Sequence, residues 1–221
     1  SEIAPRCADA MRGVPDEGFE VGIHVWDSAR WCRDAADAKA PWTSRQMQRA
    51  AERFQEIFGV PARVHGATGW QMNAHAYRLT QRLGFDYCSD TRGTHPFVPV
   101  VNAELIACPQ VPTTLPSLSE LLAAEGTSLE AAPNALLQAP RGSDAPAGHV
   151  YTLQAELEGM KLLPLFEQVM AAWRSDGIEL VALSDYLRTA HAATLPRHCV
   201  RSGAIAGGPA RAAMQGPEFL A

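Results

Sequence analysis

The pattern of apolar and polar residues alternates along this chain between short apolar runs and apolar positions at helical spacing. The helical spacing predicts helices over 44–58, 73–83 and 160–174. The apolar runs between them are bounded by loop-forming residues and predict strands at 19–25, 62–65, 85–88, 149–157 and 178–183. Strands that alternate with helices favour an α/β fold, with a parallel sheet or barrel and helices outside.

Capping residues mark several of the expected helix ends. Ser44 and Asn73 precede their helices and can accept hydrogen bonds from the first backbone N–H groups. Ser117 and Glu120 form a capping-box pattern, and Ser184 is expected to cap a final helix. These residues support the helical assignments independently of the apolar pattern.

Composition narrows the class of protein. The chain has 221 residues, enough for one sizeable core, and a formal net charge of −5. This negative net charge argues against non-specific nucleic-acid binding, which needs clustered basic residues. The five cysteines are odd in number and lack CxxC spacing, which indicates reduced thiols and a cytoplasmic protein. No apolar run approaches the roughly 18 residues of a membrane-spanning helix.

The two ends of the chain carry separate expectations. The chain begins at Ser1 without a methionine and reads as the middle of a fold, so we expect a missing amino-terminal strand. We divide it into a barrel domain, 1–201, and a glycine- and alanine-rich tail, 202–221, expected to be mobile or to lie over the surface. An absent strand would leave open edges, which favours a homo-oligomeric contact or closure by the tail after Cys199.

Polar side chains gather where the predicted strands end. In a parallel sheet these carboxyl ends meet on one rim, where metal and substrate sites form. An imidazole, carboxylates, a guanidinium and indole rings on one rim suit a sugar, because aromatic faces stack on sugar rings while Asp and Arg bind hydroxyls and phosphates. The four clusters lie at 24–27, 69–71, 90–92 and 154–156.

Each candidate also has a purely structural interpretation. His24 could be a satisfied histidine at a strand end, and Asp90 with Arg92 could form a local ion pair. Glu156 and Glu158 alternate with apolar neighbours, which is typical of a solvated strand face. The indole rings are more often packing than ligand platforms: Trp26, Trp31 and Trp70. Further histidines lack metal-like spacing: His65, His75 and His95.

Several motifs in a fixed order carry a family resemblance. They are EVGIHVWD at 20–27, Gly69-Trp70, SDTRG at 89–93, PTTLP at 112–116 and VYTLQAELEG at 150–159. Together they resemble the NodB-type polysaccharide deacetylases. More narrowly, they resemble the ArnD-like branch, the 4-deoxy-4-formamido-L-arabinose-phosphoundecaprenol deformylases. The resemblance covers nearly the whole chain.

The resemblance implies a distorted (β/α) barrel that hydrolyses a non-peptide carbon–nitrogen bond, the N-acyl group of an amino sugar. In this family an Asp and two His hold a divalent metal (zinc, manganese or cobalt) that activates water. A second Asp is the base, and a late-strand His protonates the leaving amine. The implied substrate is a sugar linked to undecaprenyl phosphate, as in lipid A modification. Because this substrate is linked to a lipid, the resemblance also implies a peripheral association with the bacterial inner membrane.

This chain departs from the family pattern at its centre. His24 matches the first metal-binding histidine, but Ser28 stands at the second, and Gln154 stands at the position of the acid. No Asp-x-Asp strand precedes His24. Asp90 and Arg92 complete the expected catalytic set. The expected substrate-binding residues are Trp26, Asp27, Trp70 and Glu156.

These departures leave the function open between three interpretations. A hydroxyl and one imidazole are a poor ligand set for a borderline ion, and a glutamine amide delivers no proton, so we expect impaired catalysis. The chain is then an amino-sugar deformylase or deacetylase of doubtful activity, or a catalytically inactive protein that binds a sugar or glycolipid. Alternatively, it is an altered or truncated form of an active parent.

Overall fold

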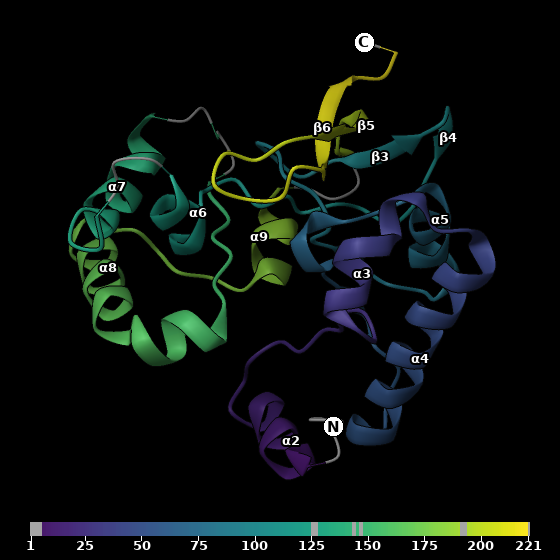
Figure 1. The fold of residues 1–221 in the computed structure, drawn as a ribbon, viewed down its shortest axis with the longest axis horizontal. Helices are drawn as coiled ribbons and strands as arrows, with labels where there is room; N and C mark the ends of the chain where they lie inside the picture. The colour runs from purple at the N-terminus through teal and green to yellow at the C-terminus, as the bar shows by residue number, and fades with distance from the viewer. Residues whose placement is uncertain (1–5, 125–127, 143–144, 146–147, 191–193, 221) are drawn as a thin grey trace.

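The computed structural model describes residues 6–124, 128–142, 145, 148–190 and 194–220 (Figure 1). The helices are α2 (Ala8–Asp16), α3 (Ser28–Asp34), α4 (Ala40–Phe58), α5 (Ala74–Arg82), α6 (Leu118–Ala123), α7 (Ala132–Gln138), α8 (Leu163–Ser175) and α9 (Leu183–Thr189). The shorter turns are η1 (Ala35–Asp37), η2 (Thr68–Trp70), η3 (Ala139–Gly142) and the π-helical η4 (Leu157–Lys161). The strands are β1 (Val64–His65), β2 (Tyr87–Cys88), β3 (Val98–Val101), β4 (Glu104–Leu105), β5 (Arg197–Gly203) and β6 (Ala212–Glu218).

Extended segments near residues 23, 64, 88 and 110 lie side by side in sequence order and run parallel. The pairs that define this order are Ile23–His65, Val64–Tyr87, Cys88–Gln110 and Arg92–Thr113. The backbone N–H groups of Thr114 and Leu115 then donate to the carbonyl of Val150, at 3.0 and 3.1 Å. The predicted parallel α/β order is confirmed, although each ladder is short.

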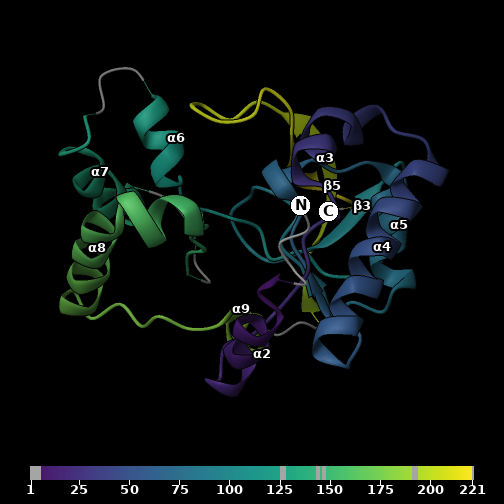
Figure 2. The same ribbon diagram turned by 60° about the horizontal axis from the view of Figure 1, so that its bottom comes forward.

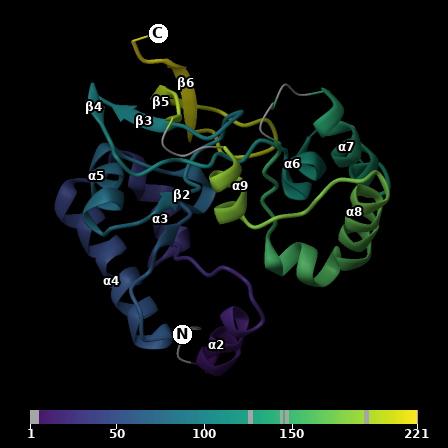
Figure 3. The ribbon, with the colours of Figure 1, turned by 180° about the vertical axis from the view of Figure 1, so that it is seen from behind.

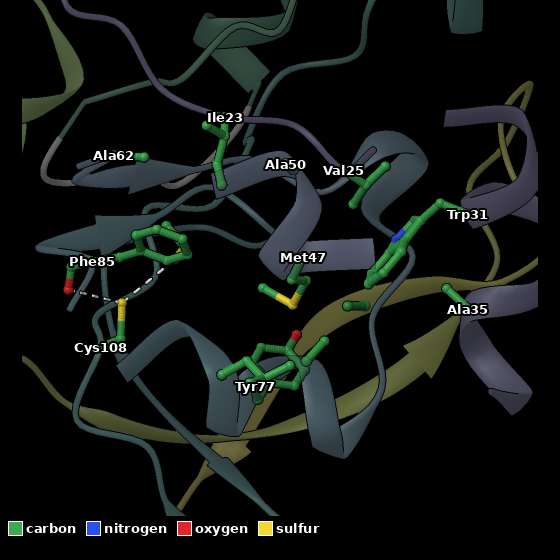
Figure 4. Packing of buried hydrophobic residues seen from close by; sticks show 14 of the residues in the cluster. Ile23, Val25, Trp31, Ala35, Met47, Ala50, Ala62, Tyr77, Phe85 and Cys108 are labelled. Atoms are coloured by element: carbon green, nitrogen blue, oxygen red, sulfur yellow. Dashed lines mark hydrogen bonds between the residues drawn. The ribbon is translucent and has the colours of Figure 1, made fainter. Parts of the chain in front are cut away.

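Helices α4 and α5 pack against these segments and enclose the main core (Figure 4). Met47 of α4 and Tyr77 of α5 face each other there, 0% and 2% exposed. Trp31 is buried as well: it stacks on Trp42 with ring centroids 5.5 Å apart and donates its Nε1–H to the carbonyl of Gln71 at 2.7 Å. Trp31 therefore packs in the core, as the structural interpretation of the indole rings predicted.

The predicted helix ends are confirmed in part. Asn73 Oδ1 accepts the N–H of Ala76 at 2.9 Å and caps α5. Ser117 and Glu120 form the expected capping box of α6. Ser44, in contrast, lies inside α4, because Pro41 in the first turn extends that helix towards its N-terminus at no hydrogen-bond cost.

The end of α4 and the start of α9 show the same mixed outcome. Gly59 ends α4 as predicted, with a left-handed φ of 74° that favours glycine. The prediction for Ser184 is wrong, because α9 begins at Leu183 with Ala182 as its capping position.

Two predicted strands, 149–157 and 178–183, belong to no ladder among the described residues. Residues 149–154 are extended, but the carbonyl of Gln154 accepts the N–H groups of Leu157 and Glu158, both at 2.9 Å, and starts a helical turn. Alternation of apolar and polar residues does not distinguish an isolated extended segment from a paired strand, because both place successive side chains on opposite sides.

The tail is ordered, contrary to the expectation of mobility. It supplies β6 to a second sheet of order β4–β3–β5–β6, seen from behind in Figure 3. Ala212 and Ala213 are only 3% and 7% exposed. A Cβ at Gly203 would lie 2.8 Å from Met214 Cγ, so small residues here allow close strand packing. Strand β5 also runs through the expected domain boundary at 201/202.

Helices α6, α7 and α8 form a separate lobe away from α3–α5, visible in Figures 1 and 2. Their own core contains Leu118, Leu136 and Val169, each 0% exposed. In the sequence, α6 and α7 lie between the segments near 115 and 150, and α8 follows the second of these segments.

Apart from the N–H of Phe19, which donates to Val14, one edge of the segment 19–25 pairs with no other backbone among the described residues. Ile23 uses its N–H and C=O towards β1, on Val64 and Gly66. A groove of about 870 Å³ follows the segment, lined also by α2 and α4. The tail does not fill it, because β6 pairs with β5. Closure by the tail is therefore wrong, whereas a contact with a second copy stays a prediction.

The core assignment leads to a stability prediction. Met47→Ala should lower the free energy of unfolding by about 2 to 5 kcal/mol, because it leaves a cavity in a packed core. The matched control is Met160→Ala, since Met160 is 72% exposed, and its loss should be about 0.5 kcal/mol or less. Urea unfolding of both variants measures the difference. Equal losses would contradict the assigned core.

Candidate functional site

The carboxyl ends of the parallel segments form a connected polar rim. The hydroxyl of Thr68 donates to that of Ser28 at 3.3 Å. On the next side, Trp70 donates Nε1–H to Thr113 Oγ1 at 3.2 Å, and Thr113 and Thr152 share a hydrogen bond of 2.6 Å. These contacts join side chains of segments that follow separate parallel strands, and the meeting of all four predicted clusters stays a prediction.

His24 is exposed on this rim, and its ring orientation is fixed. Its Nδ1 contacts the carbonyl oxygen of Gly66. A carbonyl only accepts, so Nδ1 carries the proton and Nε2 keeps its lone pair.

The residues at this position do not fit the metal that the family resemblance implies. A divalent ion in such a site needs several strong ligands. His24 offers one imidazole nitrogen, and Ser28 offers a neutral hydroxyl already hydrogen-bonded to Thr68. Among the described residues, neither belongs to a group of metal-binding side chains. At this position the rim therefore offers hydrogen-bonding groups and not a set of metal ligands.

A buried group next to the rim does combine metal-binding side chains: His65, Cys88 and Asp90, whose donor atoms lie within 4.8 Å of one another. Imidazole, thiolate and carboxylate are all zinc ligands. Burial, however, raises the pKa of the Cys88 thiol well above its ordinary value, which favours the protonated form.

Asp90, within this group, is already hydrogen-bonded on both oxygens. Its Oδ1 accepts the N–H of Ala67 at 2.8 Å and pairs with His65 Nδ1 at 2.7 Å, and Oδ2 accepts from Gln110 at 3.3 Å. His65 was not predicted as a site residue because its spacing to other histidines is not metal-like, although it ends the predicted strand 62–65. Stacking on Phe85, with centroids 5.7 Å apart, holds the ring.

Arg92 pairs with a residue that is distant in sequence, not with Asp90. Its Nη1 lies 3.1 and 3.2 Å from the carboxylate oxygens of Glu120, and its guanidinium lies 4.9 Å from the centre of the Trp70 ring. Burial lowers the pKa of Arg92, and the Glu120 charge opposes that effect. The local Asp90–Arg92 pair is therefore wrong, and Arg92 is held against the indole at the rim.

The segment around Gln154 contains one buried carboxylate. Gln154 and Glu156 are exposed, but Glu158 is 1% exposed, so its assignment to a solvated face is wrong. Its oxygens accept the hydroxyl of Tyr151 at 2.9 Å and the N–H of Gln154 at 3.0 Å. Burial and this hydrogen bond raise the pKa of Tyr151.

Trp26 and Asp27 have partners outside the rim. Asp27 caps α3 by accepting the N–H of Arg30 at 3.0 Å. Trp26 lies beside the groove, with the guanidinium of Arg49 4.1 Å from its ring centre and that of Arg53 at 5.7 Å. Their roles in substrate binding stay predictions.

The Arg92–Glu120 pair generates a stability prediction. Glu120→Ala should cost about 3 to 5 kcal/mol, because it leaves a largely buried guanidinium unpaired. The control is Glu104→Ala, whose partner Arg78 lies at 2.6 Å in a pair about one-third exposed, and it should cost about 1 kcal/mol or less. Similar unfolding midpoints for both variants in urea would count against the buried pair.

The sequence of the chain is similar to that of known proteins over most of its length. No protein-family model matches the chain. A relative from Shewanella sediminis is 28% identical over 185 residues, covering 84% of this chain and 58% of the relative. Another from Wigglesworthia glossinidia brevipalpis is 27% identical over 186 residues, covering 84% and 64%. Both are described as the deformylase ArnD. The chain thus spans about three fifths of these relatives.

Solved structures share the fold at low sequence identity. A polysaccharide deacetylase structure from Mycobacterium smegmatis matches with a TM-score of 0.68 and 19% identity, covering 88% of this chain and 70% of that one. One from Pseudomonas aeruginosa PAO1 gives 0.63 and 19%, covering 86% and 65%. A family 4 acetyl xylan esterase from Clostridium thermocellum, in complex with a cobalt ion, gives 0.51 and 13%, covering 83% and 71%. The chain therefore has the fold of the NodB-type polysaccharide deacetylases, and its sequence is similar to relatives described as the deformylase ArnD.

Proposed function

We propose that this rim binds a lipid-linked amino sugar of the 4-formamido-arabinose class, and that removal of the N-formyl group is the reaction for which the framework is built. The observation that carries the proposal is that His24 and Ser28 contact Gly66 and Thr68 of the loop that ends at Trp70, in a chain similar to relatives described as ArnD. Formate and a free amine would be the products.

Sugar binding is supported by the chemistry of the rim. The exposed hydroxyl of Ser28 and the half-buried hydroxyls of Thr68 and Thr152 are polar groups that suit sugar hydroxyls. Arg92 lies against Trp70 with its charge paired to Glu120, so it is proposed to position the indole and not to bind a phosphate directly. Glu156 is exposed and is proposed as a further substrate contact.

Hydrolysis should be strongly reduced in this chain. The leaving amine needs a proton as the carbon–nitrogen bond breaks, and the Gln154 amide has no acidic proton to give. Loss of general acid catalysis costs roughly two to four orders of magnitude in rate. Ser28 adds to the loss, because a hydroxyl does not replace a metal-binding imidazole.

Restoring the missing groups should restore the reaction. The test variant carries Ser28→His, Gln154→His and an added amino-terminal strand with an Asp-x-Asp motif. It should release formate from a formamido-arabinose phospholipid at least about 100-fold faster than the same extended chain with Ser28 and Gln154 retained, because the acid is regained. Formate is measured by a coupled assay.

Two controls make this test specific. Ser175→His and Gln48→His place the same new side chains on exposed positions of α8 and α4, and they should leave the rate unchanged. A restored variant that remains as slow as its partner, while still folded, would overturn the correspondence of positions 28 and 154 to the catalytic histidines. Saturable lipid binding without hydrolysis would then favour an inactive glycolipid-binding protein.

A lipid-linked substrate would bring the chain to a membrane surface. Among the described residues, no helix combines the length and apolar character needed to cross a bilayer. We therefore propose that any association is peripheral and occurs through the bound lipid.

A further inference from the structure

The segment 19–25 has an open backbone edge beside a groove. Ile23 directs its N–H and C=O groups to β1. Because alternate residues of an extended strand direct these groups to opposite edges, the N–H and C=O groups of Gly22 and His24 face the groove. Among the described residues, neither Gly22 nor His24 has a backbone hydrogen-bond partner. Such an edge is a template on which a further strand can pair.

The groove beside this edge has an apolar wall. Phe54 and Ile57 of α4 line it, and Met11 and Val14 of α2 also contribute. Its volume is about 870 Å³. Phe19, at the start of the segment that borders the groove, is 63% exposed. A large apolar side chain therefore lies in solvent on a segment that borders an apolar groove.

The two faces of the segment differ in chemistry. Ile23 and Val25 point into the main core, as Figure 4 shows. Glu20 and His24 lie on the opposite face of the extended segment and are exposed. One oxygen of Glu20 accepts the hydroxyl of Tyr87, and the other accepts no hydrogen bond among the described residues. The exposed face therefore carries an acid and a base, four residues apart.

We propose that two copies of this chain pair antiparallel through residues 20–24, with Gly22 on the two-fold axis. In this register Gly22 faces Gly22 of the second copy, and Glu20 faces His24 of the second copy. These are the residues whose N–H and C=O groups face the groove, so each pair exchanges both of its backbone hydrogen bonds. Gly22 has no side chain to obstruct the axis, and a Cβ there would lie 2.9 Å from the carbonyl oxygen of Val64.

Side-chain chemistry selects this register. The carboxylate of Glu20 lies opposite the imidazole of His24 of the second copy, and the two-fold axis repeats this acid–base contact. On the other face, the exposed Phe19 lies opposite Val25 of the second copy, towards the apolar wall on α4. A shift by two residues in either direction loses the acid–base contact. The proposal does not rest on the proposed deformylase function.

Analytical ultracentrifugation of the chain over a range of concentrations tests the pairing. A monomer–dimer equilibrium is expected, with a dissociation constant of about 100 μM or less. Phe19→Asp should weaken the dimer at least about tenfold, because a charge replaces an apolar contact. The matched control is Val60→Asp, which should leave association unchanged, since Val60 is 56% exposed and is not among the residues that line the groove.

A charge exchange separates this register from any other contact between copies. Glu20→Lys places a base opposite a base, and His24→Glu places an acid opposite an acid, so each should weaken the dimer about tenfold. The double variant regains an opposite pair and should recover the affinity. Thermal unfolding shows whether each variant is folded. The proposal is overturned if the chain stays monomeric at every concentration, if Phe19→Asp leaves the dimer intact, or if the double variant associates no better than the single ones.

Discussion

The buried carboxylate of Asp90 joins three neighbouring segments of the parallel core. Its oxygens bind the backbone of Ala67 and the side chains of His65 and Gln110, and its side chain is fully buried. The ladders here are too short to fix the register by backbone bonds alone, since β1 and β2 pair over two residues each. A buried charge tolerates few arrangements of its partners, because any unpaired position is costly. This one interaction therefore sets where the rim residues that follow each segment lie.

Local signals in the sequence predicted much of the fold. Asn73, Ser117 and Gly59 act through their own backbone or through residues three positions away, so the sequence alone contains their partners. The order of the parallel segments was likewise predictable, because alternating strands and helices allow few topologies.

The remaining features depend on contacts between distant residues. Arg92 forms an ion pair with Glu120 and not with its neighbour Asp90. The capping box of α6 holds the Glu120 carboxylate beside the rim. The glycine and alanine content of the tail predicts mobility or a position over the surface. In the structure, these small residues allow β6 to pack closely against β5. Such pairings depend on how distant segments pack, so they cannot be predicted from the composition of the chain.

The rim and the core differ in how far their side chains contribute to folding. Ser28 and Gln154 occupy exposed positions, so their side chains contribute little to core packing. Asp90, Glu120 and Glu158 are buried and hydrogen-bonded, and a substitution at any of them would disturb the frame itself. Folding therefore constrains the buried acids whatever the rim does, while substitutions at exposed positions 28 and 154 cost the fold little.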